Sequence, residues 1–161
     1  MRARFTAAGF RFHAEWSPRG LRTLKIRRGV PPRGISSAQK FSSHDRTFLS
    51  QLRRAIKNTL HSHSPAKIPL DWNGATQFQK SVWRALQKIP RGQTRSYTQI
   101  ARAIGKPKAA RAVGAACGAN PTIVLVPCHR VIAANGSLGG FSCGLALKKK
   151  LLEQEESPQK V

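Results

Sequence analysis

Acidic residues are scarce in this chain, whereas basic ones are abundant. Six Asp and Glu stand against 29 Lys and Arg over 161 residues, so the formal net charge at pH 7 is +23. Such an imbalance opposes compact folding unless an anionic partner or counterions neutralise part of the charge. The composition therefore favours a polyanionic partner, with nucleic acid ahead of an anionic membrane surface. The alternative is a basic surface that serves only solubility.

Long apolar runs are absent as well. No segment approaches the roughly 18 residues that a membrane-spanning helix needs, and the residues after Met1 lack the continuous apolar region of a secretory signal. We therefore expect no membrane association. Hydrophobic residues still make up 40% of the chain, which is enough for a core and disfavours wholesale disorder. The length suits one domain of ordinary size, or one with a small N-terminal companion.

Cysteines are few and confined to the last third of the chain. The three are Cys117, Cys128 and Cys143. An odd number without close pairing argues against a disulfide framework and for a reducing compartment, such as the cytoplasm (nucleoid-associated) or the nucleus. No C-x-x-C occurs and the separations are too uneven for a zinc module, so we expect no metal and no cofactor.

The first part of the chain predicts a small scaffold of strands and a helix. Residues 10–26 indicate two half-buried strands joined by a turn. A basic loop rich in Pro, Gly and Ser occupies residues 27–43, and residues 45–60 repeat apolar side chains at helical spacing. We assign residues 1–72 to this domain, in which no reactive group of side chains stands out.

The second part predicts a mostly helical domain over residues 73–161. Two capping boxes of the pattern S/T-x-x-Q begin at Thr76 and at Ser96, and each marks the start of a helix. The second box begins a helix-turn-helix at about residues 96–118, in whose turn Gly105 provides a left-handed stop. The expected fold class is therefore α/β (α+β), with a sheet-plus-helix domain followed by a mostly helical one.

A final helix is expected over residues 145–156. Its apolar residues Leu145, Leu151 and Leu152 are predicted to face inward. This helix also carries half of the acidic residues of the chain. It is therefore the main source of carboxylates for any site in the second domain.

The second helix of the helix-turn-helix, predicted over residues 108–117, consists of small side chains nearly throughout. Ala and Gly cannot read base edges by hydrogen bonds, but they allow a helix to approach a groove closely. A sequence-specific repressor would place several Arg, Asn or Gln there, whereas this helix has one such arginine, Arg111. The pattern favours docking on DNA without sequence preference, and tight packing against a neighbouring helix is the alternative.

A short apolar run at residues 122–126 leads to Pro127 and then to Cys128, His129 and Arg130. We predict a buried strand that carries the thiol at its end. The nucleophilic form of cysteine is the thiolate, and a neighbouring histidine or cation lowers the thiol pKa toward neutrality. The alternative is that this cysteine is a small buried hydrophobic residue.

An activating imidazole needs a group that orients it. The candidates are Glu153, Glu155 and Glu156 on the final helix. The alternative is that these glutamates pair with the lysines at residues 148–150. Sequence spacing leaves this choice open.

Taken together, these segments resemble the O6-alkylguanine-DNA alkyltransferases, also called methylated-DNA–protein-cysteine methyltransferases. The similarity covers about residues 70–156, where every segment occurs in order and at the family's spacing. In chain order the segments are Phe78-Gln-x-x-Val-Trp83, Ser96-Tyr97, Gly105-Lys-Pro-Lys-Ala-Ala-Arg-Ala-Val-Gly114, Asn120-Pro121, Pro127-Cys-His-Arg-Val131 and Gly139-Gly140-Phe141. The N-terminal part matches only in outline.

The resemblance implies direct DNA repair by an enzyme that acts once. Cys128 would take the alkyl group from O6 of guanine and keep it as a thioether. His129 would act as the base through a bound water, with Glu155 orienting it and Asn120 bracing the turn that holds them. Tyr97 would donate a proton to the departing guanine.

The resemblance also implies how the partner is bound. The partner would be double-stranded DNA, contacted in the minor groove without sequence preference by a monomer, with the target nucleotide turned out of the stack. Arg111 would fill the vacated position. The other DNA contacts would be Tyr97, Ala112, Gly114 and Ala115, and the guanine pocket would be lined by Val131, Phe141 and Ser142.

Two other functions are compatible with parts of the pattern. A non-catalytic protein would bind alkylated guanine and mark it for other repair, but relatives of that kind lack the reactive cysteine. A plain helix-turn-helix regulator would bind a specific sequence and tolerate the loss of Cys128. The chain departs from the common family pattern at Cys143 in the pocket loop, and Cys117 on the recognition helix is a further possible site of oxidation.

Overall fold

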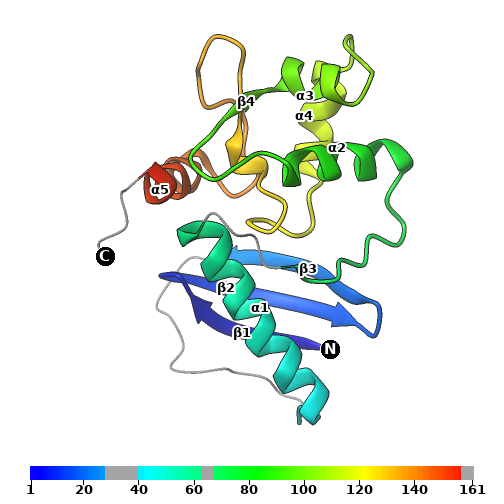
Figure 1. Ribbon diagram of the computed structural model, residues 1–161, viewed down its shortest axis with the longest axis vertical. Coiled ribbons are helices and arrows are strands. Elements are labelled where there is room, and N and C mark those ends of the chain that lie inside the picture. The colour runs from blue at the N-terminus through cyan, green and yellow to red at the C-terminus, as the bar shows by residue number, and fades with distance from the viewer. Residues whose placement is uncertain (28–39, 63–66, 157–161) are drawn as a thin grey trace. The chain divides into compact units, whose positions relative to one another are not determined.

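The computed structural model describes residues 1–27, 40–62 and 67–156, and in them the fold is of the predicted mixed α/β class. Most of the loop expected at residues 27–43 lies outside these ranges. The chain divides into two compact units (Figure 1). Met1–Asn73 and Pro121–Ile123 form the N-terminal unit, and Gly74–Asn120 and Val124–Val161 form the C-terminal unit.

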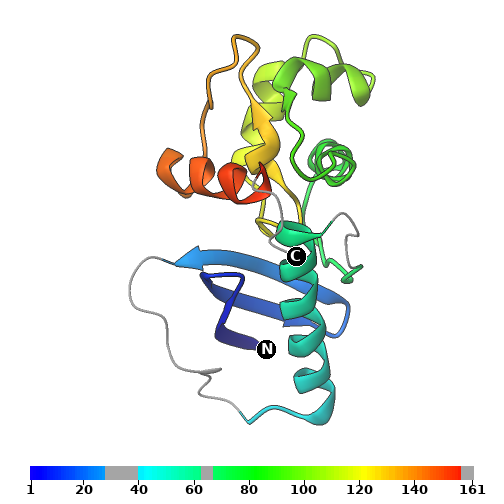
Figure 2. The ribbon, with the colours of Figure 1, turned by 60° about the vertical axis from the view of Figure 1, so that its left-hand side comes forward.

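A three-stranded antiparallel sheet and one long helix make up the N-terminal unit. The strands are β1 Arg2–Ala7, β2 Phe10–Ser17 and β3 Gly20–Arg27, in the order β1-β2-β3. The helix α1, Ser43–His61, lies across one face of this sheet (Figures 1 and 2). The two predicted strands and the helix are confirmed. Strand β1 is not predicted, because Phe5 is its single large apolar residue.

Strand alternation turns the apolar side chains of the sheet toward α1. Trp16 stacks on Phe48 of α1 with 5.6 Å between ring centroids, and its Nε1 donates to Asp45 Oδ1 at 3.0 Å. Asp45 also closes a capping box with Ser42 at the first turn of α1. The carboxylate of Asp45 therefore caps the N-terminus of α1 and also connects this helix to the sheet through the hydrogen bond from Trp16. The buried apolar residues of the sheet are Ala3, Phe5, Phe10, Phe12, Ala14, Trp16, Leu21 and Leu24.

Short helices and two short strands make up the C-terminal unit. The helices are α2 Gln77–Gln87, α3 Tyr97–Ala103, α4 Ala110–Gly118 and α5 Leu145–Glu156, with a 3-10 turn, η1, at Cys128–Arg130. The strands β4 Arg95–Ser96 and β5 Val131–Ile132 pair in parallel. Because β4 leads directly into α3 and β5 follows η1, this pairing brings the start of α3 close to the residues around η1.

The helix-turn-helix predicted from the sequence is formed by α3 and α4. Both predicted capping boxes are present, at Thr76 and at Ser96. Gly105 has a φ of 71°, the left-handed conformation expected of the stop. Helix α4 begins at Ala110 rather than at the predicted position because residues 107–108 lie in a turn.

Two local predictions are wrong. The apolar run before Cys128 is buried but is not a strand, since Val124 has a φ of 74°, which extended backbone does not allow. In α5, Leu145 does not face inward but is 51% exposed, whereas Lys148 and Glu155 are buried. The two charged side chains point into the interior because each has hydrogen-bond partners there, Val131 O for Lys148 and His129 and Arg130 for Glu155.

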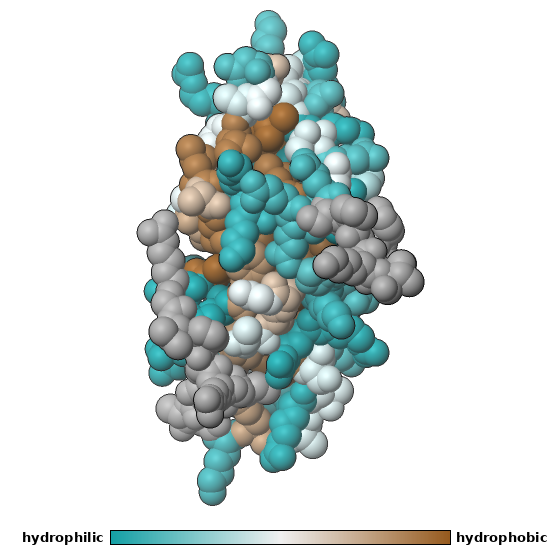
Figure 3. Space-filling view, turned by 90° about the vertical axis from the view of Figure 1, so that its left-hand side faces the viewer, coloured by the Kyte–Doolittle hydropathy of each residue, from teal (hydrophilic) through white to brown (hydrophobic). Residues whose placement is uncertain are grey.

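The surface reflects the polar, basic composition. Hydrophilic side chains occupy much of the face that Figure 3 presents, and a smaller apolar area lies between them. Among the described residues, the large hydrophobic side chains with high exposure are Met1 and Leu145. Within residues 1–27, 40–62 and 67–156, no helix has the length and apolar character needed to cross a membrane.

Candidate active site

A cavity of about 550 Å³ lies within the C-terminal unit, and Cys128 is on its wall. Cys128 begins η1 and is 4% exposed. Tyr97 of α3, Arg111 of α4 and the loop residues Phe141 and Ser142 lie on the same wall. With Gly114, six residues that the sequence assigns to the site over a span of 46 positions therefore border one space, whose size is typical of small-molecule sites.

Asn120 holds the thiol and the turn before it. Its Nδ2 donates to Val126 O at 2.7 Å and to Cys128 Sγ at 3.1 Å. Burial raises the pKa of the Cys128 thiol to about 11, although the hydrogen bond from Asn120 acts in the opposite direction. The predicted shift toward neutrality is therefore wrong, because desolvation outweighs the neighbouring charges and hydrogen bonds.

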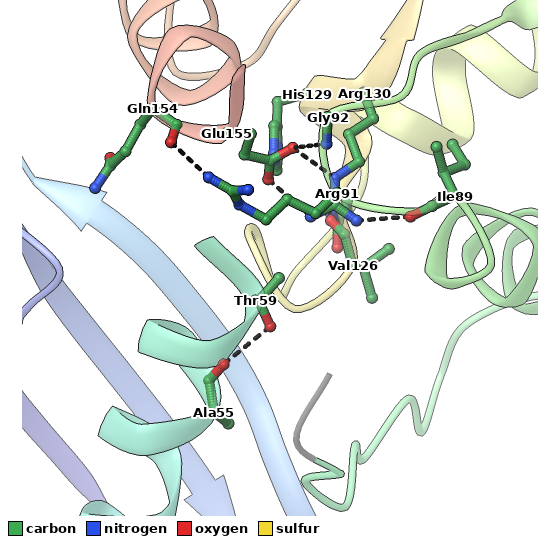
Figure 4. Close-up of polar contacts among 11 residues, drawn as sticks. Ala55, Thr59, Ile89, Arg91, Gly92, Val126, His129, Arg130, Gln154 and Glu155 are labelled. Atoms are coloured by element: carbon green, nitrogen blue, oxygen red, sulfur yellow. Dashed lines mark hydrogen bonds and ion pairs between the residues drawn. The ribbon is translucent and has the colours of Figure 1, made fainter. Parts of the chain in front are cut away.

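Glu155 joins His129 and Arg130 in a buried network (Figure 4). Its Oε1 accepts from His129 Nε2 at 2.9 Å and from Arg130 Nη2 at 2.7 Å, and its Oε2 accepts from Arg130 Nε at 2.9 Å. Arg130 Nη1 also donates to Ile89 O at 2.6 Å, and Gly92 N donates to Glu155 Oε2 at 3.4 Å. Two-point binding by the guanidinium fixes the orientation of the carboxylate.

The structure thus decides which glutamate reaches His129. Glu155 does so from the last turn of α5. Glu153 instead pairs with Lys149 at 3.7 Å, as the alternative interpretation proposes for this cluster of charges. The sequence pattern did not assign Arg130 a role beside Glu155, although this arginine directly follows His129.

These contacts define the charge states around His129. Burial raises the pKa of Glu155, but hydrogen bonds from His129 and Arg130 outweigh it and bring the value to about 2. Burial lowers the pKa of His129, although Glu155 acts against this shift. At neutral pH a neutral imidazole therefore donates from Nε2 to an ionised carboxylate, which leaves Nδ1 as an acceptor. Nδ1 is buried and has no hydrogen-bond partner among the described residues.

Lys148 is a buried cation that the sequence pattern did not place in the site. Its Nζ donates to the backbone carbonyls of Val131 and Leu138, which lie on either side of a turn. This turn leads into the cavity loop, the loop that carries Phe141 and Ser142. Burial lowers the pKa of Lys148. A lysine within a run of three lysines gives no sequence signal for a buried role in the site.

Val131, predicted to line the pocket, is fully buried and does not lie on the cavity wall.

Tyr97 lies against the loop that carries Phe141. Its hydroxyl donates to Gly140 O at 3.4 Å. A Cβ placed on Gly139, whose φ is +63°, would lie 3.0 Å from the Tyr97 ring and hydroxyl, so this position accommodates little more than glycine. Burial raises the pKa of Tyr97, so the phenol keeps its proton at neutral pH.

The outer face of α4 is smooth apart from one side chain. Ala112 and Ala115 are exposed, and Gly114 is half-buried. Arg111 is exposed and, like Gly114, borders the cavity. The opposite face of α4 packs into the unit, with Ala116 buried. The alternative interpretation, tight packing against a neighbouring helix, therefore holds for the inner face of α4, whereas docking of its outer face on DNA stays a prediction.

All three cysteines are free thiols. Cys117 borders the same cavity as Cys128, and burial raises the pKa of the Cys117 thiol to about 12. Cys143 follows Ser142 in the cavity loop and is half-buried. In the part of the chain that the structure describes, no group of His, Cys, Asp and Glu has the arrangement of a metal site.

The chain is similar to known proteins over much of its length. The model of the family described as 6-O-methylguanine DNA methyltransferase, DNA binding domain, matches residues 77–157. A methylated-DNA–protein-cysteine methyltransferase of Methanosarcina mazei is 56% identical over 109 residues, which cover 65% of this chain and 68% of that protein. An inducible Bacillus subtilis protein of that name is 56% identical over 89 residues, which cover 55% of this chain and 49% of that protein.

The likeness extends to solved structures. The crystal structure of Mycobacterium tuberculosis OGT in complex with DNA matches with a TM-score of 0.70 and 36% identity, covering 94% of this chain and 89% of that chain. The chain spans about half the length, or less, of several curated relatives that it matches. On the family match and these identities, the chain belongs to the family of 6-O-methylguanine DNA methyltransferases.

Proposed function

We propose that the protein repairs DNA by transferring the alkyl group from O6 of an alkylated guanine to its own Cys128, once per molecule. The observation that carries the proposal is the cavity whose wall includes the thiol of Cys128, the phenol of Tyr97 and Arg111. The names of the relatives, methylated-DNA–protein-cysteine methyltransferases, support the same reaction. The activity is thus that of an S-methyltransferase that turns over once.

His129 removes the proton from the thiol. Its Nδ1 is the basic position, and the proton reaches it through the water that the family resemblance implies. The carboxylate of Glu155, held by Arg130, stabilises the imidazolium that forms. Because the pKa of Cys128 is about 11, the thiolate forms as the substrate reacts rather than being stored beforehand.

The alkyl transfer is a single displacement. A bond forms between Sγ of Cys128 and the alkyl carbon, while the bond from that carbon to O6 breaks and leaves its electron pair on the guanine. A soft, polarisable thiolate suits attack on a saturated carbon better than a hydroxyl would. Tyr97, which keeps its proton at neutral pH, donates it to the guanine so that a neutral base departs, and the phenolate that remains takes up a proton from solvent. The thioether product is stable, so each molecule acts once.

Double-stranded DNA is the partner that we propose, contacted in the minor groove by a monomer through the outer face of α4. The small side chains of Ala112, Gly114 and Ala115 permit close approach without reading base edges. Arg111 takes the place of the nucleotide that is turned out of the stack. The charge of +23 adds phosphate contacts, so binding weakens steeply with salt.

The cellular setting follows from the same chemistry. A nucleophilic thiol in a cavity with a second cysteine on its wall is lost on oxidation. We therefore propose that the protein acts in a reducing compartment that contains DNA, the cytoplasm with its nucleoid or the nucleus.

Mass spectrometry of the protein after mixing with a duplex that contains one O6-methylguanine tests this proposal. We expect one added methyl on the peptide that bears Cys128, saturating at one per protein, and none with the undamaged duplex. Tight, lesion-selective binding without a change in mass would favour a non-catalytic damage-recognition protein. A methyl group on Cys143 instead would mean that the reaction is right and the assigned thiol is wrong.

A further inference from the structure

About half of the positive charge lies in the N-terminal unit, which contains neither the cavity nor α4. Residues 1–73 contain 15 of the 29 Lys and Arg and three of the six acidic residues, which gives a formal net charge of +12. The cavity and the helix-turn-helix both lie in the C-terminal unit. The N-terminal unit is therefore strongly basic for a reason that alkyl transfer does not supply.

The sheet of this unit gathers part of that charge on one face. Its apolar side chains turn toward α1, so its polar ones share the opposite face. The strand register places Arg4, His13 and Lys25 in one row across the sheet, Thr6, Arg11 and Arg27 in the next, and Arg2, Glu15 and Thr23 in a third. We call Arg2, Arg4, Arg11, Lys25 and Arg27 on this face the basic sheet face.

The side chains of this face influence one another. Burial lowers the pKa of His13, Glu15 raises it, and Arg27, Arg4 and Arg2 lower it further. His13 is therefore mostly neutral at neutral pH and adds little charge. Glu15 is the one carboxylate among the described residues of this face, so five cations are opposed by a single negative charge.

The geometry of the basic sheet face suits a phosphate backbone. Neighbouring strands lie ~4.8 Å apart and alternate residues on a strand ~6.8 Å apart, so the cations form a close array on one face. Arg4, Lys25 and Arg27 are exposed. The exposed basic residues of α1, among them Arg53, Arg54 and Lys57, follow a single helix instead of three adjacent strands and form no such array.

The same face lacks what single-stranded nucleic acid requires. Proteins that hold single strands on a sheet stack the bases on aromatic side chains. All Phe and Trp of the three strands are buried toward α1 instead, namely Phe5, Phe10, Phe12 and Trp16. Contact with the backbone of a duplex is therefore favoured over base stacking.

We infer that the basic sheet face binds the phosphate backbone of double-stranded DNA without sequence preference, as a second DNA contact besides α4. The choice of DNA among polyanions rests on the proposed function, whereas the array of charges does not. The N-terminal unit then contributes directly to affinity for undamaged DNA, on which a repair protein spends most of its search.

Two matched triple variants test the inference. Arg4→Gln/Lys25→Gln/Arg27→Gln removes three exposed cations from the basic sheet face, and Arg53→Gln/Arg54→Gln/Lys57→Gln removes three exposed cations from α1. Affinity for an undamaged duplex is measured across a salt series. The slope of log affinity against log salt changes by about 0.9 for each phosphate that the protein no longer neutralises, so we expect a decrease of about 2–3 in the first variant and less than about 1 in the second. Equal decreases, or none, would overturn the inference.

A footprint on the unmodified protein removes any dependence on how the variants fold. Lysines are acetylated with and without an undamaged duplex, and the modified peptides are quantified by mass. We expect the duplex to slow acetylation of Lys25 several-fold and to leave Lys57 unchanged; both are exposed in the structure. Acetylation of Lys25 at the same rate with and without DNA would show that this face does not bind it.

Two further readouts separate this inference from the proposed function. The sheet-face variant should react with free O6-benzylguanine as the unmodified protein does, because the cavity lies in the other unit. Failure of the unmodified protein to react would contradict the proposed function and leave the footprint result standing. Protection of Lys25 by phosphatidylglycerol vesicles but not by the duplex would overturn the assignment of DNA.

Discussion

The two units differ in what they bury. In the N-terminal unit the interior consists mainly of aromatic and aliphatic side chains, and its two buried carboxylates, Asp45 and Asp71, accept hydrogen bonds from neutral groups such as Trp16 and Ser17. In the C-terminal unit His129, Arg130, Lys148 and Glu155 are all buried. Burial of charge costs free energy unless each charge is paired and hydrogen-bonded. Clusters of buried, paired charges occur most often at functional sites. The buried charges of the C-terminal unit are therefore typical of a reactive site, and the apolar interior of the N-terminal unit is typical of a scaffold.

The largest effect is expected from Cys128→Ser, which removes the proposed nucleophile. We expect no alkyl transfer to a duplex or to free O6-benzylguanine, because a serine hydroxyl is a poor nucleophile toward saturated carbon. Binding to a duplex with O6-methylguanine should be retained, since Cys128 contributes no charge. Gel-shift and mass measurements on the same sample separate the two properties. Residual transfer would mean that the chemistry does not depend on this side chain.

Glu155→Gln should affect both stability and reaction in the C-terminal unit. The change leaves the buried guanidinium of Arg130 without its carboxylate, which typically costs about 3–5 kcal/mol. Transfer should also slow, because the imidazolium of His129 loses its stabilising charge. Chemical denaturation and the rate with free O6-benzylguanine measure the two effects. Glu153→Gln, at the exposed pair with Lys149, is the control and should change stability by less than about 1 kcal/mol.

Glu155 also predicts a dependence of stability on pH. Its pKa falls from the ordinary 4.5 to about 2 on folding, so the ionised form stabilises the folded unit above about pH 4.5. This contribution is lost as the pH falls from about 4.5 toward 2. The difference in stability between the unmodified protein and Glu155→Gln should therefore shrink over that range. A difference that stays constant with pH would contradict the assigned charge state.

Arg111→Ala should weaken repair of DNA while leaving the chemistry intact. Turning a nucleotide out of the stack costs a few kcal/mol, part of which the arginine offsets. We expect the rate with duplex substrate to fall at least about tenfold and the rate with free O6-benzylguanine to change less than about twofold. Arg102→Ala, an exposed arginine on α3, is the matched control. Equal losses on both substrates would contradict the assigned role.

Gly139→Ala should narrow the cavity next to Tyr97. The new Cβ would lie 3.0 Å from the ring and the hydroxyl, and φ at this position is +63°, so ring or loop must shift. Strain of this kind costs of order 1–3 kcal/mol. We expect transfer of a benzyl group to slow more than transfer of a methyl group, measured as the ratio of the two rates. Gly136→Ala, which has open space around it and φ of +82°, controls for backbone strain alone.

The smallest effect is expected in the N-terminal unit. Ser42→Ala removes one half of the capping box at the start of α1, which typically costs about 1 kcal/mol. The rate with free O6-benzylguanine should not change, because no residue of this unit lines the cavity. Thermal unfolding and the transfer rate give the two values. A slower reaction would show that the scaffold contributes to the chemistry and would remove the contrast between the units.

Much of the secondary structure could be predicted from local signals. Capping boxes at Thr76 and Ser96 begin helices where expected, and Gly105 ends α3 in the left-handed conformation. The missed strand β1 and the wrongly predicted strand before Cys128 have one cause. In both, the backbone is set by partners outside the segment, by pairing with β2 in one case and by Asn120 bonding to Val126 O in the other.

The family and the residues proposed to react can already be predicted from the order of the amino acids, because motif segments, helix caps and apolar periods act over a few neighbouring residues. Folding settles which glutamate meets His129, across 26 positions, and that Lys148 points inward. Folding also determines that the pKa of Cys128 shifts upward instead of downward. These properties depend on desolvation and on hydrogen bonds between distant segments, and such interactions exist only once the chain has folded.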